Sequence, residues 1–224
     1  MANTYHHLGM TAHVGHAQNR GSLDEAEDWS RKSLAIKEEL GDRPGMAGAY
    51  HQLGNTANRR GRLDEADDWH RKSLTINGEL GNLPGIAGCY HQLGMTAQDG
   101  GRSVEAEDWY RKSLAITEEL GNLPGMALTY AQLGLLAQAR SQEVLALEWN
   151  IRCVTLFSEF PSPLTGTGPS VLARLTRQLG MRTLEEAWQQ VTGQPLPQGV
   201  RDYVTTQDEL QAAWLAGAGG ALAV

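Results

Sequence analysis

One segment of this chain returns along the sequence at a constant interval. The residues from Tyr50 to Gly81 recur, with most positions unchanged, from Tyr90 to Gly121, so the interval is 40 residues. Another copy begins at Tyr130, and a modified copy lies between Tyr5 and Gly41. Self-similarity at a fixed interval of about 20 to 50 residues is typical of solenoid proteins, in which each unit packs mainly against its neighbours. This repetition constrains the fold more than composition or length does.

Each unit contains two segments with the periodicity of an α-helix. In the unit that starts at Tyr50, the small and apolar residues of the first segment are spaced i, i+3, i+4 and i+7. This spacing places Leu53, Gly54 and Ala57 on one helix face with the tyrosine. The second segment, from Leu63 to Leu80, carries a similar stripe that includes Trp69, Ser73 and Leu74. The unit is therefore predicted to be a helical hairpin.

Glycine, asparagine and proline mark the predicted ends of these helices. Gly21, Gly61 and Gly101 are expected to separate the two helices of a unit, because a glycine after a helix is a common stop signal. Asn82 is expected to cap the next helix, whose first turn holds Pro84. Successive hairpins are thus joined by short connections.

The same positions resemble the tetratricopeptide repeat (TPR). The resemblance rests on an aromatic residue, a Leu-Gly pair and two alanines, which here are Tyr50, Leu53, Gly54, Ala57 and Ala66. Equivalent pairs are Leu93-Gly94 and Leu133-Gly134, and the alanines equivalent to Ala66 are Ala26, Ala106 and Ala146. The standard repeat has about 34 residues. Longer units such as these are similar to those of the LGN/Pins and kinesin-light-chain group and to TPR arrays of bacterial multidomain regulators.

The resemblance implies an all-α fold, a right-handed α-solenoid of about four TPR-type hairpins with a helical C-terminal cap. The expected units span residues of about 3–41, 42–81, 82–121 and 122–160, which form a TPR array over 1–160. A linker rich in proline and glycine is expected at 161–169, a helical cap at 170–216 and a flexible tail at 217–224.

Two details of the C-terminal half follow from local patterns. The second helix of the fourth unit, expected at 143–159, is richer in apolar residues than its equivalents, which predicts that the cap packs on it. Within the cap, Thr183 and Glu186 have the spacing of a capping box that would open a helix at Leu184.

The first unit departs from the pattern by five residues. Tyr5 and Trp29 are 24 residues apart, against 19 from Tyr50 to Trp69, and removing His13–Ala17 restores the register. Five residues rotate a helix by about 140° net, so the first helix is expected either to break or to use another packing face. His13 and His16 would share a helix face, but no cysteine or carboxylate completes a metal site. A modified N-terminal cap is preferred, and no metal site is predicted.

Composition and charge argue against several classes of protein. The net charge of −7 argues against a nucleic-acid-binding surface. The sequence has no apolar stretch of about 18 residues, and Met1–Tyr5 lacks the features of a signal peptide. We therefore expect a cytoplasmic protein that binds neither nucleic acid nor membrane. Cys89 and Cys153 lie on different predicted helices and outside any CxxC motif, which predicts two buried, reduced thiols.

Tryptophans and ion pairs also recur at the repeat interval. Trp29, Trp69, Trp109 and Trp149 would either offer a stacking platform for a ligand or pack between repeats, and their place on the apolar stripe favours packing. The second helices repeat acid–base pairs at i, i+4, such as Glu27–Arg31 and Asp67–Arg71. These pairs are predicted to form a solvated surface rather than an acid–base site.

No catalytic motif is recognisable. The phosphate-binding loop, the G-x-S-x-G turn and the HExxH motif are all absent from the sequence. Cys89 precedes Tyr90-His91, as a thiol nucleophile near a base would, but its equivalents are Ala49 and Thr129, which favours a position for small packed residues. We predict that the chain is not an enzyme and uses no cofactor.

By resemblance, the first helices of the repeats line a concave groove that holds an extended peptide or a partner helix. The implied groove residues are His51, Asn55, Asn58 and Arg59, then His91, Met95, Gln98 and Asp99, and finally Leu135 and Gln138. Asparagine and glutamine would bond a peptide backbone, and Met95 and Leu135 would give an apolar floor. Chaperone-binding repeats use lysine where His51 and His91 stand, so a carboxylate clamp is not implied.

The predicted function is a non-catalytic protein–protein interaction module that binds a peptide or helical partner in this groove. One alternative is a self-assembling structural scaffold, which would form a homo-oligomer. Another is the sensor or scaffold arm of a larger signalling regulator. His51 and His91 further predict that partner binding changes between about pH 5.5 and 7.

Overall fold

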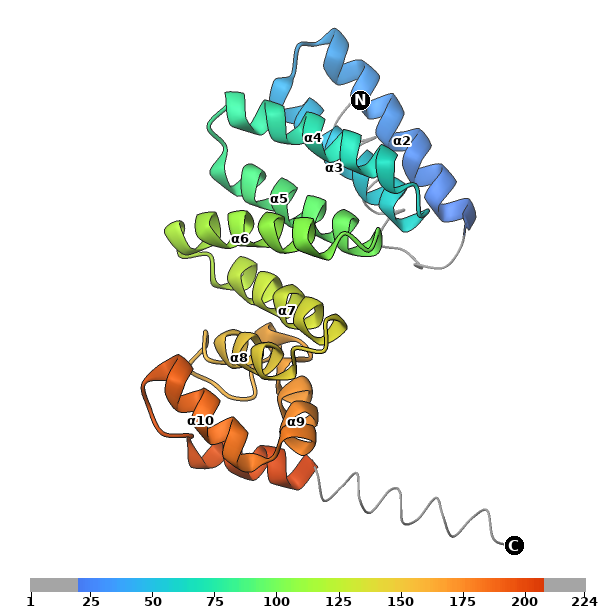
Figure 1. Ribbon diagram of the computed structural model, residues 1–224. Coiled ribbons are helices and arrows are strands. Elements are labelled where there is room, and N and C mark those ends of the chain that lie inside the picture. The colour runs from blue at the N-terminus through green and yellow to red at the C-terminus, as the bar shows by residue number, and fades with distance from the viewer. Residues whose placement is uncertain (1–19, 208–224) are drawn as a thin grey trace, which may run out of the picture. The chain divides into compact units, whose positions relative to one another are not determined.

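The computed structural model describes residues 20–207, and all regular structure within that range is helical (Figure 1). The all-α fold class is thereby confirmed. The helices are α2 (Arg20–Glu39), α3 (Arg43–Arg59), α4 (Leu63–Glu79), α5 (Leu83–Asp99), α6 (Ser103–Glu119), α7 (Leu123–Ala139), α8 (Glu143–Val154), α9 (Gly168–Leu179) and α10 (Met181–Thr192), with a 3-10 turn η1 at Pro163–Thr165. Residues 198–207 are also helical. The predicted break at His13–Ala17, the histidine pair His13/His16 and the tail 217–224 lie outside the described residues.

The predicted caps and stops explain most helix ends. Asn82 is the N-cap of α5, and its side-chain oxygen accepts a hydrogen bond from the Gly85 N–H at 3.3 Å, with Pro84 in the first turn. Gly61 and Gly101 both have φ of +72°, a left-handed conformation that glycine adopts at little cost. In the fourth repeat Ser141 takes this conformation instead, with φ of +58°. Gly21 was wrongly predicted to separate two helices, because α2 already begins at Arg20.

The chain divides into two compact units, one up to Thr117 and the other from Glu118. In the first unit, α2, α3 and α4 lie side by side and α5 packs on α4 (Figure 1). The residues that carry the family resemblance are the core here: Ala26, Leu53, Gly54, Ala57, Ala66, Leu93, Gly94, Ala97 and Ala106 are all buried. The repeat, linker and cap boundaries drawn from the sequence stay predictions.

In the second unit, α7 packs on α8, and α9 and α10 pack on the other side of α8. Leu147 and Ile151 of α8 share one hydrophobic core with Leu172, Leu184 and Trp188 of the two following helices. Burial on both sides accounts for the many apolar residues of α8.

Two predictions in this unit were wrong. α8 ends at Val154 rather than near residue 159, and the chain then turns back so that η1 contacts α7. The capping box does not form, because α10 begins at Met181. Thr183 therefore lies inside the helix and its Oγ1 donates to the Leu179 carbonyl at 2.8 Å.

Candidate functional site

In the first unit, the predicted groove residues lie on α3 and α5, the first helices of two successive repeats. His51, Asn55 and Asn58 on α3 are half-buried, and so are their equivalents His91, Met95 and Gln98 on α5. Arg59 and Asp99, at the last residues of the two helices, are exposed. The spacing i, i+4, i+7 gives each helix a row of these side chains on one face.

A hydrogen bond joins α3 to α5 on this face. The Asn58 Nδ2 donates to the Asp99 Oδ2 at 3.0 Å. The carbonyl oxygens of Asn55 and Asn58 are buried and have no hydrogen-bond partner within the described part of the chain. A buried acceptor without a partner costs free energy, about 1–3 kcal/mol, until a donor reaches it. The face therefore holds two acceptors whose bonding capacity is unused.

Beneath the two rows lie side chains that were not predicted from the sequence. They belong to a set of four buried residues, each directly after a tryptophan, which we name the floor residues: Ser30, His70, Tyr110 and Asn150. The His51 and His70 rings meet edge-on with centroids 5.5 Å apart, and the His91 and Tyr110 rings are equally close. The Tyr110 hydroxyl donates to the Gln98 Oε1 at 2.9 Å. The two floor residues with rings, His70 and Tyr110, thus contact the groove side chains above them.

The floor residues also explain the glycines of the Leu-Gly pairs. A Cβ added at Gly94 would lie 2.6 Å from ring carbons of Tyr110, and one at Gly54 would overlap the His70 ring. At Gly134 the nearest atom would be the Ala146 carbonyl oxygen at 3.6 Å, an ordinary contact. In the second and third repeats the glycine of the Leu-Gly pair therefore makes room for a ring.

Burial keeps His70 and His91 neutral. Burial, with a smaller contribution from the charge of His51, lowers the pKa of His70 to about 3 and that of His91 to about 4. Binding was predicted to change between about pH 5.5 and 7 through His51 and His91. For His91 this expectation is wrong, because its imidazole titrates below that range.

A hollow of about 400 Å³ opens beside His51, between α3, α4 and α5. Its walls are formed by residues of the N-terminal parts of α3 and α5 together with polar residues of α4. These residues are Pro44, Ala47, Gly48, Gln52, Ser73, Asn77, Asn82, Pro84, Gly85 and Gly88. Small residues at positions 47, 48, 85 and 88 leave this space open.

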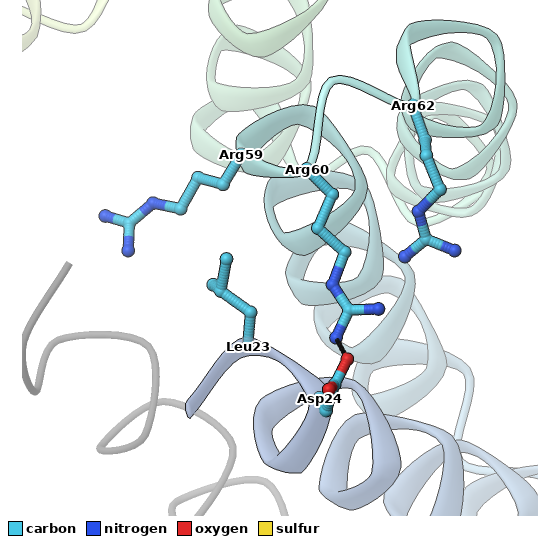
Figure 2. A pocket seen from close by; sticks show the side chains of 5 residues that line it. All are labelled: Leu23, Asp24, Arg59, Arg60 and Arg62. Carbon is cyan, nitrogen blue, oxygen red and sulfur yellow. Dashed lines mark hydrogen bonds and ion pairs between the residues drawn. The ribbon is translucent and has the colours of Figure 1, made fainter. Parts of the chain in front are cut away.

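A second hollow of about 440 Å³ lies at the C-terminal end of α3 (Figure 2). Arg60 points toward Asp24 and forms ion pairs with Asp24 and Glu27, and Arg62 binds Glu27 and Glu65 at 2.6 and 2.8 Å. Arg59, which was predicted to line the groove, points away from Asp24. The carboxylates largely balance the arginines, so this hollow is not a built anion site.

In the second unit, Leu135 and Gln138 lie on α7 at the positions equivalent to Met95 and Gln98. Leu135 is 46% exposed, and the Gln138 side chain accepts a hydrogen bond from Arg174 of α9. The floor residue Asn150 lies below them, beside a hollow of about 40 Å³. The cap therefore borders the groove face of this unit.

The repeats of this chain match models of a known protein family. A family model described as tetratricopeptide repeat matches residues 1–79, and a second model of the same description matches residues 86–120. The chain belongs to the tetratricopeptide repeat family. No curated protein is significantly similar to it. Repeats of this family generally mediate protein–protein interaction and are generally non-catalytic.

Several solved structures have similar folds. BtubC (BKLC) from P. vanneervenii superposes with a TM-score of 0.64 at 21% identity, over 81% of this chain and 79% of that one. A putative kinesin light chain from Podospora anserina, with nearly identical TPR-like repeats, gives 0.63 at 19% identity, over 93% and 96%. The apo form of RapI gives 0.69 at 14% identity, over 95% and 73%. These TM-scores show a shared fold.

On the second helices of this TPR protein, the tryptophans are packed. Trp69 stacks on Tyr50 with centroids 5.5 Å apart, and the Lys72 ammonium lies 4.2 Å from its centroid. From the preceding repeat, Arg31 lies over the same ring at 5.9 Å and pairs with Glu65 at 3.3 Å. These contacts support packing rather than a platform for a ligand. Glu27–Arg31 forms the predicted i, i+4 pair at 2.7 Å, and Asp67–Arg71 is paired in the same way.

Three further observations bear on the chemistry of this TPR protein. Cys89 and Cys153 are free and buried, and burial raises the pKa of both thiols, that of Cys153 to about 11. Across residues 20–207 no group of three potential metal-ligating side chains comes together. None of the helices in that range has the length and apolar composition that crossing a membrane requires.

Proposed function

We propose that the face formed by α3 and α5 binds a protein partner, as an extended peptide or a helix laid across the two rows. The observation that carries the proposal is the pair of buried, unpartnered carbonyl oxygens of Asn55 and Asn58. Such oxygens accept hydrogen bonds from peptide N–H groups, which every partner segment offers irrespective of its sequence. The module is cytoplasmic and non-catalytic in this proposal.

Specificity would come from the side chains beside these acceptors. Met95 is half-buried and adaptable, and it offers an apolar contact next to the neutral His91. Arg59 and Asp99 add one charge of each sign at the end of the face, and the hollow beside His51 gives room for a side chain.

The test is selection of binders from a random 12-residue peptide display library on the purified full chain. Met95→Glu is expected to weaken the selected peptides at least tenfold, because a carboxylate replaces the apolar contact. Asn55→Ala is expected to weaken them about threefold to tenfold through the lost acceptor. The matched control is Asp68→Ala on the exposed surface of α4, which should change nothing.

Affinity measured by titration calorimetry, with circular dichroism to verify helicity, decides the outcome. If both variants keep their helicity and bind the peptides as tightly as the control does, the groove assignment fails.

A further inference from the structure

We propose that the recess between α7, α8 and α9 is a separate subsite that takes one neutral, hydrogen-bond-donating side chain of a partner, such as serine, threonine or asparagine, flanked by apolar residues. The inference rests on the proposed partner-binding role of the first helices, but on different residues in the second unit. The two proposals can therefore fail separately.

The recess exists because the fourth repeat combines a glycine with a small floor residue. Under Gly54 and Gly94 the space is filled by the rings of His70 and Tyr110. Under Gly134 the floor residue is Asn150, and a Cβ added there would meet nothing closer than 3.6 Å. The result is the hollow of about 40 Å³, which is large enough for the tip of a small side chain.

One residue that lines the recess, Asn150, has an unused acceptor. Asn150 is 5% exposed, and its Oδ1 is buried with no hydrogen-bond partner in the described residues. Gln138, the other amide at the recess, is already engaged: its Oε1 accepts from Arg174 and its Nε2 donates to the Gly134 carbonyl at 3.4 Å. A donor that enters the recess would therefore bond to Asn150.

The walls select against a charged donor. They are Tyr130, Ala131, Leu135, Ala146, Thr167 and Val171, and no carboxylate is among the lining residues. A lysine or arginine would lose its hydration there without a counter-charge, and that loss is costlier than a neutral hydroxyl's or amide's. The chemistry of the site thus fits a neutral donor.

The surface around the opening is apolar and exposed. Leu128 and Leu135 are 61% and 46% exposed and stand seven residues apart on one face of α7. The equivalents on α5 are Gly88 and Met95, and those on α3 are Gly48 and Asn55, so this feature belongs to α7. A partner segment with apolar residues on both sides of the donor would cover both leucines.

The experiment compares the full chain with Asn150→Leu, which fills the recess and removes the acceptor, and Asn150→Asp, which keeps its size and adds a charge. Peptides from the random 12-residue library that bind the wild type are expected to share serine, threonine, asparagine or glutamine at one position. Asn150→Leu should weaken them about tenfold. Asn150→Asp should shift the preference at that position toward lysine or arginine.

Replacing the shared residue of the peptide by alanine should cost about tenfold on the wild type and nothing on Asn150→Leu, a readout that a purely structural asparagine would not give. The inference is overturned if the peptides bind both Asn150 variants as tightly as the wild type and only the melting temperature changes. If Met95→Glu loses affinity and the Asn150 variants do not, the proposed function is supported and the subsite at Asn150 is overturned. A selection without any binding peptide would overturn both.

Discussion

Gly94→Ala is expected to lower the melting temperature of the protein by roughly 4–8 °C, although alanine is the better helix former. The added methyl group would lie 2.6 Å from the ring of Tyr110. That ring is fully buried and its hydroxyl is held by Gln98, so it has little room to move. Overpacking costs about 3 kcal/mol here against a propensity gain of about 1 kcal/mol, a net loss of about 2 kcal/mol.

The control is the same substitution at the same repeat position, Gly134→Ala. Its Cβ would make only ordinary contacts, so helix propensity dominates and the melting temperature should rise by roughly 2 °C. Tyr110→Ser, which installs the floor residue of the first repeat, should relieve the effect of Gly94→Ala in the double variant. Thermal unfolding followed by circular dichroism tests both. Equal melting temperatures for the two glycine variants would refute the ring-accommodation role of Gly94.

A second large effect is expected in acid. His70 has a folded-state pKa of about 3, below its unfolded value of 6.5, so the unfolded chain binds more protons between these values. The stability that comes from the neutral ring is therefore complete above pH 6.5 and is lost as the pH falls toward 3. By pH 4.5 the loss from His70 alone is about 3 kcal/mol, at about 1.4 kcal/mol per unit of pH. His91, with its pKa near 4, adds to the loss in the same direction.

His70→Asn separates this effect from general acid unfolding. Asparagine is the floor residue of the fourth repeat and does not titrate, so the variant should lose much less stability than the wild type between pH 6.5 and 4.5. Urea unfolding at a series of pH values measures the difference. Parallel curves for the two proteins would show that the His70 ring is not held neutral by burial.

Much of the fold could be predicted because the same core residues recur in successive copies of the repeat. The Leu-Gly pairs, the alanine at the helix crossing and the Asn82 cap all depend on local spacing, which one chain displays in several copies. The capping box at Thr183 was misplaced because its pattern occurs by chance inside a helix that Gly180 already opens. The early end of α8 could not be read from helix periodicity, because it depends on η1 packing against α7.

The floor residues were missed for a different reason. The stripe predicted for α4 includes Trp69, Ser73 and Leu74, of which Ser73 is buried and the two larger side chains are only partly buried. The other residues buried on α4 are Ala66, His70, Ile76 and Asn77. Ser73 and Asn77 are buried because they form hydrogen bonds, such as that from the Ser73 Oγ to the Ala47 carbonyl at 2.8 Å. A signal was present, since the residue after each tryptophan varies between serine, histidine, tyrosine and asparagine while its neighbours repeat.

The contacts of Arg31 with Glu65 and Trp69 recur between the next pair of repeats, where Arg71 lies 3.8 Å from Glu105 and 5.3 Å from the centroid of Trp109. The first and second repeats thus offer the same donor surface to their successors, and the second and third repeats offer the same acceptor surface to their predecessors. A duplicated 40-residue segment inserted at this junction would meet matching surfaces on both sides. A unit can accordingly be gained or lost at this junction in evolution without a new interface having to arise.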